Sequence, residues 1–112
     1  MQIKTGVDIV SVNEFEKSIK NGGQAFLIRC FNRIELNDQK VQHLSGIFAA
    51  KEAIIKALEF PADSWLTITV TSQKNGKSQA NFIYLKNKII SSDISISHIK
   101  EYAVAVFTVI LE

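Results

Sequence analysis

The sequence predicts an α+β fold in which one strand and a set of helices precede a group of antiparallel strands. Three observations support this order. Residues 3–10 form an apolar opening segment typical of a strand. Residues 37–59 place their large apolar side chains at helical spacing. Residues 65–111 contain several strand-like segments and the pair Asn75-Gly76, a strong hairpin signal. We therefore expect an antiparallel sheet packed against one long and two short helices.

The opening strand is expected to lead into the two short helices. Ser11 or Asn13 can cap the first, because acidic residues follow in its first turn, where the helix dipole favours anions. The pair Gly22-Gly23 is expected to end it, since either glycine can adopt the left-handed conformation common at helix C-termini. The second short helix is expected over residues 24–31.

The long helix is expected to open at Asn37-Asp38 and to run to about Glu59, with Pro61 ending it. At about 100° per residue its large apolar side chains fall on one arc, which predicts the face that packs on the core. Lys51 falls within this arc. Its ammonium must therefore reach solvent, find a partner, or face a ligand or another subunit.

The second half of the chain is expected to supply the remaining strands. Residues 65–72 and 79–85 would form the two arms of the hairpin. Residues 94–98 alternate cleanly between isoleucine and serine before a histidine. Residues 102–111 are apolar almost throughout, so this strand is expected to be buried on both faces or to lie in a subunit contact.

The composition predicts a single globular domain over residues 1–112, with 46% hydrophobic residues to fill a core. The net charge of +2 is too weak and too evenly spread to predict nucleic-acid binding. No apolar run approaches the ~18 to 20 residues of a membrane span, and the N-terminus lacks a signal-peptide layout. The lone Cys30 cannot form an internal disulfide, which favours a cytoplasmic location.

A small set of charged residues predicts a site for a phosphate ester. Glu52 and Lys56 lie one helical turn apart, and Asp8 lies near the end of the opening strand. Two carboxylates with a lysine beside them are the minimum needed to hold Mg²⁺ against a phosphate. Taken alone, each residue has an ordinary explanation. Asp8 can simply be an acidic residue at the end of a strand. Glu52 and Lys56 can form a solvent-exposed ion pair on the helix. His98 can be a turn residue whose imidazole bonds to the backbone.

Four ordered blocks of the sequence together resemble one family. The blocks are, in chain order, Gly6-Val7-Asp8; Phe26, Arg29, Phe31 and Glu35; the run FAAKEAIIK from Phe48 to Lys56; and Ser95, Ser97, His98, Tyr102, Ala103 and Ala105. They resemble the holo-[acyl-carrier-protein] synthases, the small class of 4′-phosphopantetheinyl transferases. The resemblance covers nearly the whole chain and implies the fold of that family.

The resemblance implies Mg²⁺-dependent transfer of the 4′-phosphopantetheine arm of coenzyme A to a serine of an apo acyl carrier protein or a related carrier protein. It implies that Asp8 and Glu52 hold the metal and that Lys51, Lys56 and His98 contact coenzyme A. It also implies catalytic roles for Glu52, Lys56 and His98. The base is left open between Glu52 and a metal-bound water. Family members of this length are expected to be homotrimers with coenzyme A between neighbouring subunits.

The chain departs from the family pattern at several positions. Ile47 stands where an arginine is usual, and Ser78 stands where the family turn has proline. Residues 59–63 replace a glycine-rich stretch, and residues 86–93 are too short for the usual helix. These departures predict altered substrate choice or affinity. They also leave an alternative function, a non-catalytic family member that binds coenzyme A or a carrier protein. A third reading, an unrelated α+β assembly protein, is opposed by the four ordered blocks.

Overall fold

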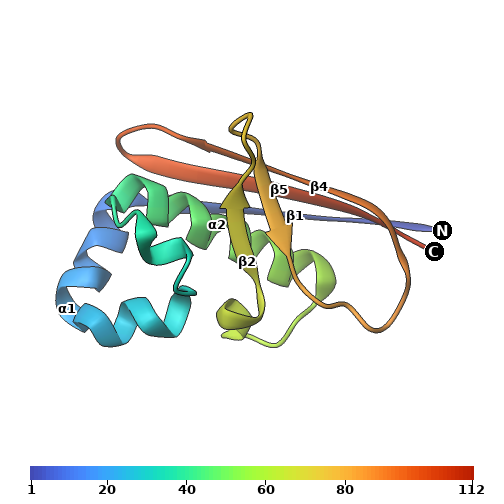
Figure 1. Ribbon diagram of the computed structural model, residues 1–112, viewed down its shortest axis with the longest axis horizontal. Coiled ribbons are helices and arrows are strands. Elements are labelled where there is room, and N and C mark those ends of the chain that lie inside the picture. Colours follow the sequence, from blue (N-terminus) through green and yellow to red (C-terminus); the bar gives the residue numbers. More distant parts are fainter.

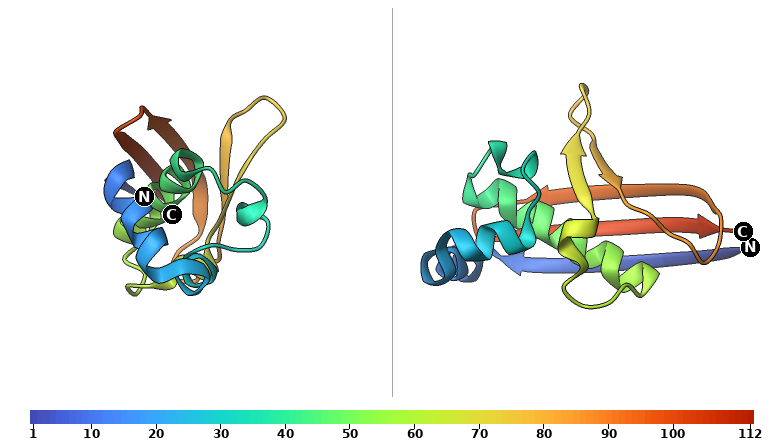
Figure 2. Two further views of the ribbon diagram at one scale, coloured as in Figure 1. Left: turned by 90° about the vertical axis from the view of Figure 1, so that its left-hand side faces the viewer. Right: turned by 60° about the horizontal axis from the view of Figure 1, so that its bottom comes forward.

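The structure, a computed structural model of residues 1–112, is built on a three-stranded antiparallel sheet in the order β1–β5–β4 (Figure 1). The strands are Gln2–Ser11 (β1), Ile89–His98 (β4) and Tyr102–Leu111 (β5). The last strand is central, so that Ala105 lies between Asp8 on β1 and Ile96 on β4. The two chain termini lie side by side at one end of the molecule (Figures 1 and 2). The predicted α+β fold is confirmed.

The long helix α2, Val41–Leu58, covers one face of this sheet (Figure 2). Its first half approaches β4, where Gly46 meets Ile96, and its second half approaches β1, where Gly6 meets Ala53. The core lies between the helix and the sheet. Small buried side chains on α2 let the two lie close together: Ala49, Ala50, Ala53 and Ala57.

Gly6 makes the close approach of β1 and α2 possible. A Cβ atom built on it would lie 1.9 Å from the carbonyl oxygen of Ala53 and 3.2 Å from the backbone nitrogen of Ala57. Because neither backbone atom can rotate away, we expect Gly6→Ala to cost at least the ~1–3 kcal/mol that is typical of overpacking.

Gly46→Ala is the matched control for this prediction. Its Cβ would meet only the Cγ2 methyl of Ile96, at 3.0 Å, and alanine is the better helix former. We expect this variant to be close to neutral. Chemical denaturation measures both free energies of unfolding, and equal stability of the two variants would contradict the close packing at Gly6.

A hairpin of two short strands forms a separate two-stranded sheet beside the main one (Figure 1). The strands are Thr69–Ser72 (β2) and Ser78–Asn81 (β3). Gly76 takes a φ of 86° at the turn, which confirms the predicted hairpin. Both arms are shorter than predicted. Residues Ser64–Thr67 form a 3-10 helix (η2) instead, at whose end the Ile68 N–H donates to the Trp65 carbonyl. The same carbonyl also accepts the Lys51 ammonium. The strand β4, in contrast, is longer than predicted, because it begins at Ile89, five residues earlier.

The helix α1 spans Val12–Cys30 and contains the break that the sequence predicted. The hydroxyl of Ser11 accepts the N–H of Glu14, so the first of the two candidate caps is confirmed. Gly23 interrupts the helix with a φ of 58°, which separates the two short helical segments. None of the helices has the length and apolarity needed to cross a membrane.

The start of α2 differs from the prediction by three to four residues. Residues Glu35–Asn37 form a 3-10 helix (η1), and the Asp38 carboxylate accepts the N–H of Lys40 rather than capping a helix at its own position. The carboxylate of Glu35 also accepts the N–H of Asn32, which holds this segment in a tight turn. The predicted end is confirmed, since Glu59 takes a left-handed φ of 56° directly after Leu58.

Within the single chain, β5 is buried on one face only, so burial on both faces does not hold there and the alternative, a subunit contact, stays a prediction. Alternate residues from Ala103 to Leu111 pack under α2. The opposite face of the sheet is uncovered and strongly apolar. Its exposed apolar side chains, here called the outer sheet face, are Ile3, Val7, Ile9, Tyr102 and Val106.

Candidate active site

Three of the residues singled out from the sequence lie together where β1 meets α2. Asp8 follows Gly6 by two residues, so its side chain leaves the same face of the strand, toward the helix. Glu52 and Lys56 share one face of α2. The Lys56 ammonium donates to Asp8 Oδ1 at 2.9 Å and to the Val7 carbonyl at 3.1 Å. We call Asp8, Glu52 and Lys56 the carboxylate–lysine cluster. The three side chains of this cluster can meet because Gly6 lets β1 lie close to α2.

The two carboxylates of this cluster repel each other in a partly buried setting. Burial raises the pKa of Glu52, and the negative charge of Asp8 raises it further, while Lys56 has the opposite effect. The side chain of Asp8 is only 17% exposed. A cation placed between the carboxylates would relieve this repulsion. The cluster therefore favours a positively charged ligand.

The donor atoms of the cluster fit Mg²⁺. This ion takes six oxygen ligands and is usually bound by one or two carboxylates together with phosphate and water. Asp8 and Glu52 supply two carboxylates, and no group of three or more His, Cys, Asp or Glu side chains gathers in the chain to form another metal site. Mg²⁺ would therefore need further oxygen ligands here, which a phosphate substrate and water can provide.

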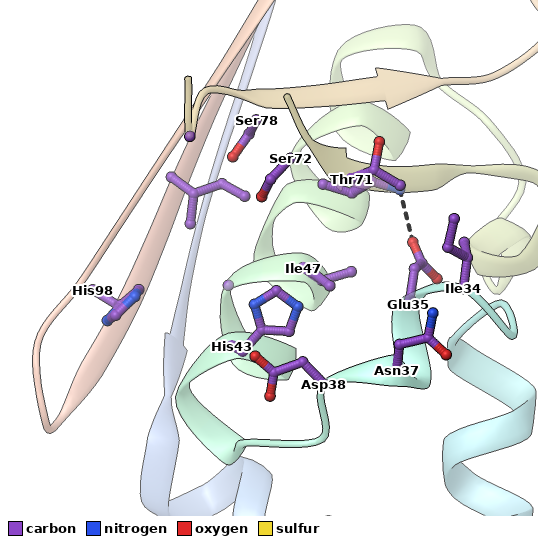
Figure 3. A pocket seen from close by; sticks show the side chains of 14 residues that line it. Ile34, Glu35, Asn37, Asp38, His43, Ile47, Thr71, Ser72, Ser78 and His98 are labelled. Carbon is purple, nitrogen blue, oxygen red and sulfur yellow. Dashed lines mark hydrogen bonds between the residues drawn. The ribbon is translucent and has the colours of Figure 1, made fainter. Parts of the chain in front are cut away.

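His98 lies at the end of β4, apart from the cluster, and lines a cavity of about 450 Å³ (Figure 3). His43 and Ile47 of α2 line the same cavity, with Ser72 and Ser78 of the hairpin facing them across it. His43 and Glu52 are nine residues apart on α2, which places them on opposite faces of the helix. Within the chain, α2 therefore separates His98 from the carboxylate–lysine cluster.

Lys51 is fully buried, and its ammonium is bound within the protein. It donates to Glu35 Oε1 at 2.6 Å, to the Cys30 carbonyl at 2.9 Å and to the Trp65 carbonyl at 3.0 Å. Burial lowers the pKa of Lys51, and the hydrogen bond with Glu35 opposes that effect. An ammonium has three N–H donors, so none is left for a ligand. The expectation that Lys51 contacts coenzyme A does not fit this placement.

Glu35 belongs to the second of the four family blocks, but its role as a buried acceptor was not predicted. Its carboxylate accepts the ammonium of Lys51 and the backbone N–H groups of Asn32 and Val70, the last two at 2.7 Å. It thus ties α2 to the turn after α1 and to β2. Lys51 was a signal for this role, because a lysine in an apolar arc requires a buried acceptor.

Comparison with known proteins assigns this architecture to a family. The family model of the 4′-phosphopantetheinyl transferase superfamily matches residues 4–107. The holo-[acyl-carrier-protein] synthase of Protochlamydia amoebophila (strain UWE25) is 37% identical over 116 residues, which cover 94% of this chain and 95% of the relative. This chain belongs to the holo-[acyl-carrier-protein] synthase family of phosphopantetheinyl transferases. The synthase of Thermodesulfovibrio yellowstonii is 38% identical over 106 residues, covering 89% of this chain and 91% of the relative.

Solved structures of synthases from this family share the fold. That of Helicobacter pylori, in complex with coenzyme A, is 32% identical and superposes with a TM-score of 0.82 over 95% of this chain and 99% of the relative. That of Bacillus anthracis str. Ames, in complex with CoA (3′,5′-ADP), is 30% identical with a TM-score of 0.78 over 95% and 94%. The family predicted from the four sequence blocks is thereby confirmed.

Proposed function

We propose that this synthase family member transfers the 4′-phosphopantetheine arm of coenzyme A to a serine of an apo acyl carrier protein, in a reaction that depends on Mg²⁺. The observation that carries the proposal is the carboxylate–lysine cluster in a chain of this family. Relatives solved with coenzyme A support the donor, and the names of the relatives support the acceptor. A cytoplasmic location is proposed with it, since Cys30 is a buried free thiol.

The proposed reaction is a phosphoryl transfer. The serine oxygen bonds to the phosphorus next to the pantetheine arm, and the bond from that phosphorus to the bridging pyrophosphate oxygen breaks. The products are holo carrier protein and adenosine 3′,5′-bisphosphate. Such transfers need mainly positioning and stabilisation of negative charge. Lys56 can place its ammonium on the phosphate oxygens, and Mg²⁺ bound by Asp8 and Glu52 would add charge neutralisation.

Two side chains are candidates to accept the serine proton. Glu52 is the first candidate, because its carboxylate belongs to the carboxylate–lysine cluster and carboxylates can serve as general bases. His98 is the second candidate, because it is exposed on the cavity wall and imidazole is the most frequent general base. If His98 is the base, it would come from a different surface of the chain than the proposed metal ligands Asp8 and Glu52.

We further propose a homotrimer in which each site lies between two subunits. The outer sheet face exposes five large apolar side chains, an unusual concentration for a monomer of this size. The separation of His98 from the carboxylate–lysine cluster by α2 is explained if one subunit supplies the cluster and its neighbour supplies the His98 cavity. Ile47 and Ser78, two departures from the family pattern, line that cavity. The cavity would then receive the nucleotide end of coenzyme A.

A mixing experiment tests the shared site. We expect Glu52→Ala and His98→Ala each to lose most activity alone, and their mixture to recover part of it after dissociation and reassembly. A mixed site is intact when the cluster comes from one variant and the cavity from the other, so random mixing restores about a quarter of the sites. Light scattering of the wild-type protein gives the subunit number. A monomer with full activity, or a mixture that recovers nothing, would refute the shared site.

The direct test of the function is a transfer assay. We expect coenzyme A, Mg²⁺ and an apo carrier protein to give a modified carrier protein, detected as a gain in mass. Removal of Mg²⁺ by a chelator and the Lys56→Ala substitution should each abolish the gain. Transfer is expected to be slow or restricted to few carrier proteins, because the changed residues around the cavity supply binding energy and orientation.

The presence of Ile47 favours one alternative function. An isoleucine on the cavity wall offers no charge to a phosphate where the family usually has arginine. A non-catalytic member that binds coenzyme A or a carrier protein would therefore be the second candidate. Calorimetry that shows coenzyme A binding, with no modification of any carrier protein encoded beside the gene, would decide for this alternative.

A further inference from the structure

Trp65 carries a buried polar atom that is not hydrogen-bonded to any other group of the protein. Its indole Nε1 is the one buried side-chain nitrogen or oxygen in the protein with no hydrogen-bond partner. A buried donor left unsatisfied costs about 1–3 kcal/mol, and the N–H of a buried tryptophan usually finds an acceptor. Exceptions of this kind often mark a functional constraint.

The indole ring is held next to Glu52 from two sides. It packs on Phe48 of α2, with ring centroids 5.6 Å apart. Phe48 and Glu52 are four residues apart and share a face of the helix. On its backbone side, the Trp65 carbonyl accepts the ammonium of Lys51, the residue that directly precedes Glu52. The position of the ring is therefore fixed relative to the Glu52 carboxylate.

The indole N–H and the Glu52 carboxylate are neighbours in this structure. They do not reach the distance and angle of a full hydrogen bond, so the buried donor has no acceptor on the nearby carboxylate.

We propose that Trp65 is a positioning residue for Glu52, whose carboxylate accepts the indole N–H on one oxygen when the site is loaded. This inference rests on the proposed function, in which Glu52 holds Mg²⁺. A fixed donor on one oxygen sets the plane of the carboxylate and leaves the other oxygen for a ligand. Partners of this kind orient the residues that bind a metal, and their loss typically costs 10–100-fold in metal affinity or activity.

The chain offers a direct readout, because Trp65 is its only tryptophan. A single indole N–H signal is therefore expected in the ¹H–¹⁵N spectrum of the full chain. Addition of Mg²⁺ and coenzyme A should move this proton signal downfield as the hydrogen bond forms. A signal that stays in place in the loaded protein would overturn the proposal.

Activity measurements supply the second readout. We expect Trp65→Phe to raise the Mg²⁺ concentration for half-maximal transfer about tenfold, with a smaller effect on the rate at saturating Mg²⁺. Biosynthetic replacement of the sole tryptophan by β-(3-benzothienyl)alanine keeps the ring shape and removes only the N–H. It should behave like Trp65→Phe. Wild-type Mg²⁺ dependence in this analogue would overturn the proposal even if Trp65→Phe were impaired by lost packing.

The two readouts separate this proposal from the proposed function. If the indole signal moves with Mg²⁺ and coenzyme A but no carrier protein is ever modified, the transfer function fails and the contact with Glu52 stands. If carrier protein is modified and the signal stays in place, the function stands and the role of Trp65 fails.

Discussion

Asp8→Ala and Glu52→Ala are each expected to lower the rate of transfer by at least about a hundredfold, the usual cost of removing a group that stabilises developing charge. Each carboxylate is one of only two that the cluster offers to Mg²⁺. Loss of either would leave a metal ligand set of one carboxylate, and Asp8→Ala would also release the ammonium of Lys56. Transfer assays at limiting and saturating Mg²⁺ measure the effect.

The fold should survive these substitutions, which separates a lost site from a lost structure. Because the pKa of Glu52 is raised in the folded protein, its ionised form costs stability. This cost appears as pH rises above the ordinary pKa of a glutamate and is complete above the raised value. Glu52→Ala should therefore be at least as stable as wild type at neutral pH, with the gain vanishing in acid. Thermal unfolding of both proteins at several pH values tests the sign of this stability difference.

The exposed acid Glu14 provides a matched control for both variants. It pairs loosely with Lys17 at 3.7 Å on the surface of α1, away from the cluster. Glu14→Ala should keep the wild-type dependence on Mg²⁺. Full activity of Asp8→Ala or Glu52→Ala at limiting Mg²⁺ would contradict the assignment of the metal site.

Lys51→Met is expected to have the largest effect on stability, a loss of about 3–5 kcal/mol. Both members of the Lys51–Glu35 pair have fully buried side chains, 2.6 Å apart. Removal of the lysine would leave the Glu35 carboxylate buried without its cation, and the Cys30 and Trp65 carbonyls would each lose one hydrogen-bond donor. Urea denaturation measures the free energy of unfolding.

Two comparisons show whether burial of the pair is the cause. The double variant Lys51→Met with Glu35→Gln removes both charges and should recover part of the lost stability, since no uncompensated charge remains. Lys56→Met breaks an ion pair on the same helix whose lysine is 57% exposed, and its effect on stability should be small. If Lys51→Met unfolds at the same urea concentration as Lys56→Met, the buried Lys51–Glu35 pair does not stabilise the fold as predicted.

The parts of the site that were predictable are those that depend on local spacing. Glu52 and Lys56 share a helix face because they are four residues apart. Asp8 faces the helix because it lies two residues after Gly6 and therefore on the same face of the strand. The hairpin at Asn75-Gly76 and the break at Gly23 follow from backbone preferences of the same short range.

The parts that could not be predicted depend on contacts between distant residues. Lys51 could have served a ligand, and only the fold places Glu35, sixteen residues earlier, against it. Residues 65–67 were predicted to begin a strand, but the Ile68 N–H closes a 3-10 turn on the carbonyl of Trp65, which also accepts the Lys51 ammonium. The position of His98 relative to α2 likewise depends on the sheet order, which residue spacing does not contain.

The two opposite faces of α2 give this protein a modular design. One face presents Glu52 and Lys56 to β1, and the other presents His43 and Ile47 to the cavity beside β4. Amino-acid changes on the cavity-facing side of α2 can therefore alter substrate recognition. The same changes leave Glu52 and Lys56, on the opposite side of the helix, in place. A combinatorial library at the cavity-facing positions of α2, with His98 unchanged, should yield altered substrate preference at a far higher frequency than it yields inactive protein. The departure at Ile47 is the kind of drift that such an arrangement tolerates.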